Sequence, residues 1–482
     1  MGRELWFGAI AALMLTANAV IAAELWIGAA ETDITPDRPV ALDGNKTGPI
    51  ARSIKSRCRA EVLALEAREQ SKPTDAAILV VCDLVRIRPG VQAAFRAHVA
   101  SHLPGFDINK LFLAATHTHC APVTAQDEYD GYGDAMQPKE YVSFLFGRLT
   151  DAAVKAWQER QPGTFAWGLG HAVIAQGRRT VHKDGSAVMY GSTSRADFRH
   201  LEGGVDQAVD ALYFLDAEKK MKAVVLTAQA PAQSGGGTHI DADYWHWVRE
   251  GVRQRHGQRT VVLGFIAPSG NQVPRCVLRK GAEERMIKLK GVSWTREIGE
   301  RVVRAVDDVW QAVSHDLRSD VVFSHRVECF DLPGRKVTED EYCAAQKKHD
   351  ELNAKAKLVG GDYWEKRRAA KTLARYEAQK IADPAVGVEM HVIRLEDVVI
   401  ATNPFELYPE YGVRILGRSP AGQTVLLSFA SPLDESGYMA TREATKAGGY
   451  SALVESCPVG HEGGQIFVDR TVEAIKKLFL KK

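Results

Sequence analysis

Apolar residues along this chain fall into two alternating patterns. Short runs rich in β-branched and aliphatic residues indicate buried strands, and they cover Ala76–Cys82, Leu111–Ala115, Ala223–Ala228, Thr260–Ile266, Val321–Phe330 and Val398–Ala401. Apolar residues at helical spacing separate many of these runs, as in Val91–Leu103, Glu140–Arg160 and Trp294–Val313. Such alternation predicts an α/β fold with a layered, mixed β-sheet core and flanking helices. Functional side chains are then expected on loops at strand ends.

Residues 338–380 differ in composition from the segments around them. They are rich in Glu, Lys, Ala and Tyr, and are apolar only at helical spacing, with a break at Gly360-Gly361. This pattern is typical of solvated helices. We therefore expect a helical hairpin inserted on the surface of the domain.

The first 23 residues have the order of a secretory signal peptide. Arg3 precedes an apolar stretch from Leu5 to Leu15, and small residues follow through Ala22-Ala23. No later stretch approaches the ~20 uninterrupted apolar residues that span a bilayer. We expect residues 1–23 to be removed and residues 24–482 to form a single exported domain, secreted or periplasmic. An uncleaved membrane anchor is the alternative.

Charge and cysteine content narrow the class of partner. The 62 Lys and Arg residues nearly balance the 60 Asp and Glu residues, so the formal net charge is only +2. No long-range field then favours nucleic acid or an anionic membrane, and the expected partner is a small molecule. The seven cysteines form no CxxC pair, which indicates neither a zinc ribbon nor a disulfide-dense scaffold. One or two disulfides are compatible with an exported protein, and the sequence assigns no pairing.

The segment Thr116-His117-Thr118-His119 follows the apolar run Leu111–Ala115. Residues two apart in a strand point to the same face, so His117 and His119 can converge. They can share a divalent cation, or one can hold the cation while the other moves a proton. The alternative is a polar strand end with solvated histidines.

Further segments extend this pattern over most of the chain. In order they are Ile27–Pro36 (IGAAETDITP), Thr116–Pro122 (THTHCAP), Gly264–Pro274, Asn403–Glu406 (NPFE), and Tyr438 with Tyr450. Together they resemble the catalytic domain of the neutral/alkaline, non-lysosomal ceramidases, zinc amidases that cleave the N-acyl bond of ceramide. The chain looks like a divergent member that lacks the C-terminal immunoglobulin-like domain of larger members.

The resemblance implies roles for seven residues. The zinc ligands would be His117, Glu406 and Tyr438. Around the scissile amide and the polar head of the substrate would lie His119, Arg178, Tyr450 and the backbone of Gly44. Imidazole and carboxylate suit zinc, which makes a bound water nucleophilic near neutral pH, and Arg178 would stabilise charge on the carbonyl oxygen. The alternative for Arg178 is a surface pair with Arg179 that holds a carboxylate.

The chain also departs from the family's pattern. In Ala223–Pro231, Gln229 replaces the second zinc-binding histidine of the family, and a carboxamide is a weaker zinc ligand than imidazole. The loop that follows holds His239 and Asp241, either of which could complete the coordination. Solvated polar residues in a loop are the simpler interpretation of that segment.

Other nucleophiles have less support in the sequence. Cys120 stands where the family commonly has serine. Its thiolate could be a metal ligand or a nucleophile, and a small buried residue is the simpler interpretation. The family's reported serine aligns with Val273, Ser269 precedes Gly270-Asn271, and no GxSxG segment occurs. Metal-activated water is therefore the predicted nucleophile.

Three functions remain open at this point. The first is an exported, zinc-dependent hydrolase of an N-acyl bond, and the second is a metal-free ceramidase-like domain with a binding or structural role. A serine or cysteine hydrolase is a third, weaker reading. The substrate can be ceramide or another lipid, a different N-acylated amine, an N-acyl sugar or an ester, because the sequence displays no apolar stretch that specifies two lipid chains.

Overall fold

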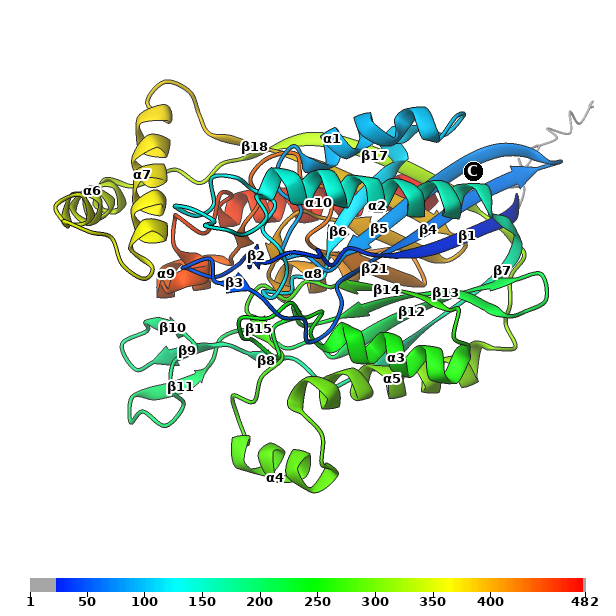
Figure 1. Ribbon diagram of the computed structural model, residues 1–482, viewed down its shortest axis with the longest axis horizontal. Helices are drawn as coiled ribbons and strands as arrows, with labels where there is room; N and C mark the ends of the chain where they lie inside the picture. The colour runs from blue at the N-terminus through cyan, green and yellow to red at the C-terminus, as the bar shows by residue number, and fades with distance from the viewer. Residues whose placement is uncertain (1–22, 480–482) are drawn as a thin grey trace, which may run out of the picture.

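The computed structural model describes residues 23–479, which form two large β-sheets, four small ones of two or three strands, and the helices that cover the large sheets (Figure 1). The larger sheet has the strand order β14-β13-β12-β7-β1-β4-β5-β6, with β16 paired beside β1. Its strands are β1 (Ala23–Asp33), β4 (Arg59–Glu69), β5 (Lys72–Cys82), β6 (Leu111–Ala115), β7 (Gln161–His171), β12 (Ala208–Asp216), β13 (Met221–Ala228), β14 (Val261–Ile266) and β16 (Asp320–Val321). The pairs β5–β6 and β13–β14 are parallel and the remaining pairs are antiparallel. The sheet is therefore mixed, as the sequence predicts.

A second, four-stranded sheet lies against the first. It has the order β17-β18-β19-β21, made of β17 (Phe323–Pro333), β18 (Ala385–Leu395), β19 (Val398–Thr402) and β21 (Gln423–Leu427). The helices that cover the two sheets are α1 (Val91–Val99), α2 (Pro138–Gln158), α3 (Tyr244–His256), α5 (Trp294–Val313), α8 (Pro409–Leu416) and α10 (His461–Phe479).

Side-chain alternation along the strands divides the interior into layers. In β5, Ile78 and Val80 belong to one core with residues of α1, α2, α3 and α5, whereas Leu79 and Val81 belong to a core shared by both sheets. Residues of α8 and α10 form a third core on the far side of the second sheet. Because successive strand residues face opposite sides, these cores define four layers in the order helices, sheet, sheet, helices. Both sheets are covered on both faces, which explains why their strands read as continuous apolar runs.

The predicted elements are present, and the α/β class is confirmed. Leu111–Ala115 is β6 and Trp294–Val313 is α5, with the predicted bounds. Val321–Phe330 spans the end of β16 and most of β17. Five long strands had no prediction from periodicity: β1, β4, β7, β12 and β18.

The predicted hairpin of residues 338–380 forms α6 (Glu339–Asn353) and α7 (Asp362–Ala378) at one end of the molecule (Figure 1). Thr338 and Glu341 form a capping box at the start of α6. Gly361 caps α7, directly after Gly360, whose φ is 55°. The two glycines therefore separate the helices, as expected.

Short elements complete the fold, and several carry residues that are important below. They are β2 (Val40–Ala41), β3 (Ile50–Ala51), β8 (Gln176–Gly177), β9 (Arg179–His182), β10 (Ala187–Met189), β11 (Phe198–Leu201), β15 (Gln272–Val273), β20 (Glu406–Leu407), β22 (Tyr438–Met439), α4 (Lys280–Lys290), α9 (Arg442–Ala447), and the 3-10 turns η1 (Ala100–His102), η2 (Ile108–Lys110) and η3 (Tyr450–Ala452).

No helix within residues 23–479 is long and apolar enough to cross a membrane. The predicted signal peptide, residues 1–23, lies outside the described part of the chain except for its last residue.

Candidate functional site

A pocket of about 870 Å³ opens where two parallel strand pairs end. The loops that follow β5, β6, β19 and β21 contribute Arg86, His117, Glu406 and Phe429 to its wall. Carboxyl ends of neighbouring parallel strands leave such a crevice because their connections diverge. The seven residues to which the resemblance assigns roles all line this pocket: Gly44, His117, His119, Arg178, Glu406, Tyr438 and Tyr450.

His117 is held with its Nε2 atom toward the pocket. Its φ of 62° turns the chain sharply after β6, and its ring stacks on Phe429 with centroids 4.3 Å apart. Nδ1 lies 2.7 Å from the carbonyl oxygen of Val85, so Nδ1 carries the proton and Nε2 carries a lone pair. Burial lowers the pKa of His117 to about 3. The ring is therefore neutral near pH 7 and can act as a ligand or an acceptor.

His119 faces the same point from the other side. Its Nε2 atom lies 3.3 Å from Nε2 of His117 and 2.6 Å from Nε2 of Gln233. Burial, together with the neighbouring His117, lowers its pKa to about 3. An amide nitrogen only donates, so Nε2 of His119 accepts from Gln233, and Nε2 of His117 carries a lone pair as well. Two lone pairs 3.3 Å apart attract a cation or a shared proton.

Because Gly44 has no side chain, the His119 ring can occupy the space beside its Cα atom. A Cβ atom added to Gly44 would lie 2.7 Å from Nδ1 of His119, and the φ of Gly44 is +76°. Both the space and the backbone conformation therefore require glycine at this position.

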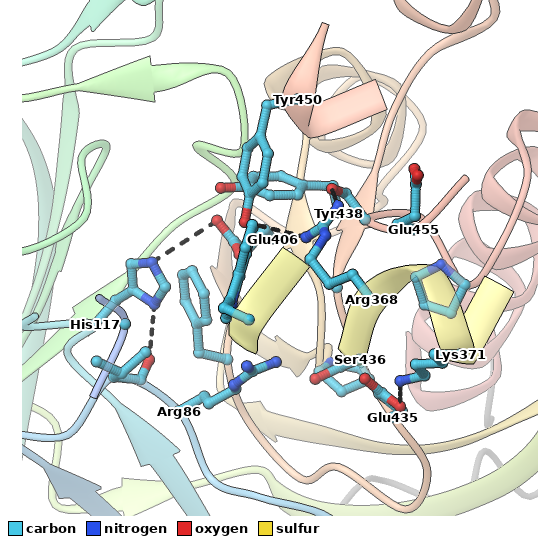
Figure 2. Close-up of a pocket in the computed structure, with 18 of the residues that line it drawn as sticks. Arg86, His117, Arg368, Lys371, Glu406, Glu435, Ser436, Tyr438, Tyr450 and Glu455 are labelled. Atoms are coloured by element: carbon cyan, nitrogen blue, oxygen red, sulfur yellow. Dashed lines mark hydrogen bonds and ion pairs between the residues drawn. The ribbon is translucent and has the colours of Figure 1, made fainter. Parts of the chain in front are cut away.

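Glu406 and Tyr438 lie side by side because β20 and β22 pair in parallel with these two residues in register. Oε2 of Glu406 is 3.7 Å from Nε2 of His117 (Figure 2). Burial raises the pKa of the Glu406 carboxyl, while Arg178 acts to lower it. Tyr450, at the start of η3, sets its ring edge-on to that of Tyr438, with centroids 5.9 Å apart.

Arg178 is a buried cation that joins these groups. Its Nη2 atom donates to the Tyr438 hydroxyl at 3.1 Å and to the Gly270 carbonyl at 2.9 Å, and lies 3.7 Å from Oε2 of Glu406. Nη1 donates to the Tyr190 hydroxyl at 3.0 Å. The side chain is 2% exposed, which is incompatible with the surface pair considered above.

Gln229 does not lie where the resemblance to the family placed it. It lines a separate, small cavity beside Asp210 and Pro268. Gln233, four residues further along, is the carboxamide that contacts His119. The chain turns after β13, so a position counted from the strand end does not predict which side chain reaches the pocket.

The proposed substitutes are also outside the pocket lining. Nε2 of His239 is 3.9 Å from Oδ2 of Asp241, and the Asp241 carboxylate accepts hydrogen bonds from Lys55 and Ser56. Cys120 is 5% exposed, and burial raises the pKa of its thiol to about 12. A thiol with this pKa is a poor nucleophile. Val273 and Ser269 are buried and lie outside the pocket lining.

The nitrogen and oxygen donors at this end of the pocket approach the spacing that a metal ion requires. Within residues 23–479, no cluster of three or more His, Cys, Asp or Glu side chains is arranged to hold one. However, zinc bonds of ~2.0–2.1 Å in a tetrahedral site place neighbouring donors about 3.3–3.4 Å apart. The separations of 3.3 Å from His117 to His119 and 3.7 Å from His117 to Glu406 are close to this value. The chemistry of these donors fits a divalent cation, with Tyr438 as a further oxygen donor.

One wall of the pocket comes from a segment predicted to be only a surface insertion. Helix α7 lines the pocket through Trp364, Arg367, Arg368, Lys371 and Arg375. Their spacing places them on one helix face. This spacing is visible in the sequence, but the whole segment is polar, so the face did not stand out. Arg86 and Gln233 are further lining residues that no motif indicated.

The fold and the site together define a four-layer α/β protein with a pocket that holds two histidines and a carboxylate at one end. Neither a protein-family model nor a curated protein matches the sequence. Among solved structures, neutral ceramidase from Pseudomonas aeruginosa superposes with a TM-score of 0.67 at 18% sequence identity, covering 94% of this chain and 75% of that one. A ceramidase complexed with C2 gives 0.65 at 17% identity, covering 95% and 76%. The fold is therefore that of the neutral ceramidases, in agreement with the resemblance of the motifs.

Proposed function

We propose that this protein hydrolyses an N-acyl amide bond with a metal-activated water. The observation that carries the proposal is the convergence of His117 Nε2, His119 Nε2 and the Glu406 carboxylate at one end of the pocket. The likeness to ceramidase structures supports the same reaction class. Export of the mature chain, inferred from residues 1–23, is part of the proposal.

A divalent cation, zinc by resemblance, would be held by His117, Glu406 and Tyr438, and would lower the pKa of a bound water toward neutrality. The protein groups then orient the substrate and move protons. Arg178 is permanently charged and fixed by its hydrogen bonds, so it can stabilise charge on the carbonyl oxygen without reorganisation.

The reaction consumes one water for each amide cleaved. The water oxygen bonds to the carbonyl carbon, the C–N bond breaks, and the nitrogen leaves as an amine, so the products are a carboxylic acid and an amine. His119 is neutral and can accept the proton of the water. The protonated ring can then pass that proton to the departing nitrogen.

A metal-free binding domain is the second candidate. Two contacts favour it. Nε2 of Gln233 lies 2.6 Å from Nε2 of His119, and Nη2 of Arg178 lies 3.7 Å from Oε2 of Glu406. These contacts can satisfy the same polar groups without an ion. Such a domain would bind an N-acyl compound without cleaving it.

Turnover separates the two candidates. The purified protein is assayed by mass spectrometry with N-acyl amines, before and after treatment with a chelator and after zinc is restored. The proposal expects amine release that the chelator abolishes and zinc restores, with loss of activity in His117→Ala and Glu406→Gln. The exposed His315 provides a control, His315→Ala, with unchanged activity. Binding without amine release under any condition would contradict the proposal.

A further inference from the structure

The pocket wall carries more positive than negative side chains. Its cations are Lys46, Arg86, Arg178, Arg367, Arg368, Lys371 and Arg375, and its acids are Glu128, Glu406, Asp434, Glu435 and Glu455. Cations in a confined site require anionic partners, because an uncompensated buried charge is costly. The question is which of these cations the protein itself neutralises.

Neighbouring carboxylates are already engaged by other cations. Arg88 binds both carboxylate oxygens of Asp43, at 2.7 and 2.8 Å. Glu128 accepts from Arg88 at 2.9 Å and from Arg367 at 3.0 Å. Lys371 pairs with Glu435.

Two further cations of the wall are also accounted for. Lys46 pairs with Glu365 at 3.4 Å. Arg375 donates to the backbone carbonyls of Val454 and Arg335, at 2.6 and 2.8 Å. Arg375 has no carboxylate partner, but its guanidinium is held by these two backbone carbonyls. Within residues 23–479, Arg86 and Arg368 are then the lining arginines that neither a carboxylate nor a backbone carbonyl contacts.

Arg86 directs its charge into the pocket from the loop that also positions His117. It follows Val85, whose carbonyl holds Nδ1 of His117, so the two groups come from one short segment. Among the described residues, its guanidinium makes neither a hydrogen bond nor an ion pair, and its Nε atom is buried without a partner. A guanidinium in this position binds an oxyanion strongly, because its donors match two oxygens of one carboxylate or phosphate.

Arg368 approaches the pocket from α7, across from the loop of Arg86 (Figure 2). Its guanidinium lies 4.4 Å from the ring centre of Trp364 and 5.0 Å from that of Tyr450. Nη2 donates to the Ser456 hydroxyl at 2.9 Å. Aromatic rings and a neutral hydroxyl orient the guanidinium but leave its charge uncompensated.

We infer that the substrate is an acidic N-acyl amine, with an oxyanion bound by Arg86 and Arg368 and its amide at the His117–Glu406 end of the pocket. This inference rests on the proposed function and specifies its substrate class. Ceramide has no charged group, so the two arginines would gain nothing from it. An N-acyl amino acid carries a carboxylate close to the amide, and a phosphorylated N-acyl amine carries the same chemistry as a phosphate.

The test compares charged and neutral substrates of equal size. Values of kcat/KM are measured for N-decanoylglycine, its uncharged amide N-decanoylglycinamide, N-decanoyl-O-phosphoethanolamine and a short-chain ceramide. The wild-type protein should cleave an oxyanion substrate at least roughly tenfold better than the uncharged amide, as charge-assisted hydrogen bonds permit. The better of the two acids identifies the oxyanion as carboxylate or phosphate. Equal rates, or a preference for ceramide, would overturn the inference.

Variants locate the preference on the two arginines. Arg86→Gln and Arg368→Gln should each reduce the ratio of kcat/KM for the acid to kcat/KM for the uncharged amide by about tenfold, mainly through the KM of the acid. Arg86→Lys keeps the charge and should restore part of the ratio. An unchanged ratio in both Gln variants, with melting temperatures near that of wild type, would overturn the assignment.

Binding measured without turnover separates this inference from the proposed function. Calorimetry with the His117→Ala protein compares N-decanoylglycine with N-decanoylglycinamide, in the presence and absence of the Arg86→Gln substitution. Preferential binding of the acid that depends on Arg86, with no cleavage by wild type, would uphold the inference and reject the hydrolase. Cleavage of the acid and the amide at equal rates would support the hydrolase and reject the inference of an acidic substrate.

Discussion

Gly44 shows how one missing side chain sets the geometry of the site. A Cβ atom there would lie 2.7–2.9 Å from three atoms of the His119 ring. Gly105 has nearly the same backbone conformation, with φ +78° against +76°, but a Cβ atom would meet nothing within 4 Å. An alanine at either position strains the backbone, but only an alanine at position 44 also displaces the histidine. Comparing the two variants therefore distinguishes these effects.

We predict that Gly44→Ala and Gly105→Ala each destabilise the fold by about 1–2 kcal/mol, the cost of a left-handed conformation for a residue with a Cβ atom. Only Gly44→Ala should also reduce kcat, by roughly 100-fold, because it displaces His119. Urea unfolding and steady-state kinetics on the same preparations measure both effects. Equal activity in the two variants would show that the position of His119 does not limit the reaction.

Gln233, and not Gln229, is the carboxamide at the site. Gln233→His should tighten zinc binding by roughly tenfold or more, since imidazole is a better zinc ligand than a carboxamide. Gln229→His serves as the matched control because Gln229 lines a different cavity, and it should leave the affinity unchanged. Competition with a chromogenic chelator gives both values. Tighter binding in the Gln229 variant alone would contradict the placement of these residues.

Most of the residues at the site could be predicted because their motifs are local. The pair His117 and His119 and the NPFE segment keep their spacing wherever the chain folds. Gln233 and Arg86 could not be predicted in the same way, because the path of a loop decides which of its side chains reaches the pocket. No spacing in the sequence encodes that path.

At the scale of elements, β4 illustrates where periodicity fails. Its sequence RAEVLALEARE is rich in residues that favour helices, yet it pairs with β1 and β5 along its whole length. It also carries Glu61, which is buried against Arg249. Long-range pairing overrides local propensity in such a strand. The clear predictions were the strands rich in β-branched residues and the amphipathic helices.

Asp210 links the two sheets, and its titration should be visible in the stability of the protein. It lies on β12, and its carboxylate accepts a hydrogen bond from Gln423 of β21 at 2.8 Å and one from Thr227 of β13, also at 2.8 Å. Burial raises its pKa from 3.8 to about 6, although both hydrogen bonds oppose the shift. Between these values the folded state binds more protons than the unfolded state.

We therefore expect the contribution of Asp210 to stability to be complete below about pH 4 and to be lost as the pH rises through about 6. The loss should be about 3 kcal/mol, given 1.36 kcal/mol per pKa unit. Urea unfolding from pH 4 to 7 should show this decline in wild type and a flatter profile in Asp210→Asn. Parallel profiles for the two proteins would mean that Asp210 has an ordinary pKa in the folded state.

At the scale of the whole molecule, the sequence predicts the class but not the number of layers. Each long buried strand faces a helix layer on one side and the other sheet on the other, so it shows an apolar run with no polar alternation. That pattern is the same for a strand in either sheet. The four layers arise from which strands pair, and the pairs β1–β4 and β17–β18 set that order.

The arrangement of the layers also explains the site. Two parallel pairs, one in each sheet, end at the same pocket, and the α6–α7 hairpin supplies the cationic wall. The end of the pocket that holds His117 and Glu406, which comes from the sheets, thus meets a charged wall that comes from the hairpin. This division predicts that changes on α7 alter substrate choice, whereas changes after β6 and β19 alter the reaction itself.

Metal content tests the central claim most directly. The mature protein is purified without chelators and its zinc is quantified by inductively coupled plasma mass spectrometry, beside His117→Ala and the control His315→Ala. The account predicts close to one zinc per chain in wild type and in the control, and its loss in His117→Ala. Absence of zinc from wild type, even after dialysis against zinc, would contradict the metal-dependent hydrolase and leave a domain that binds its ligand without cleaving it.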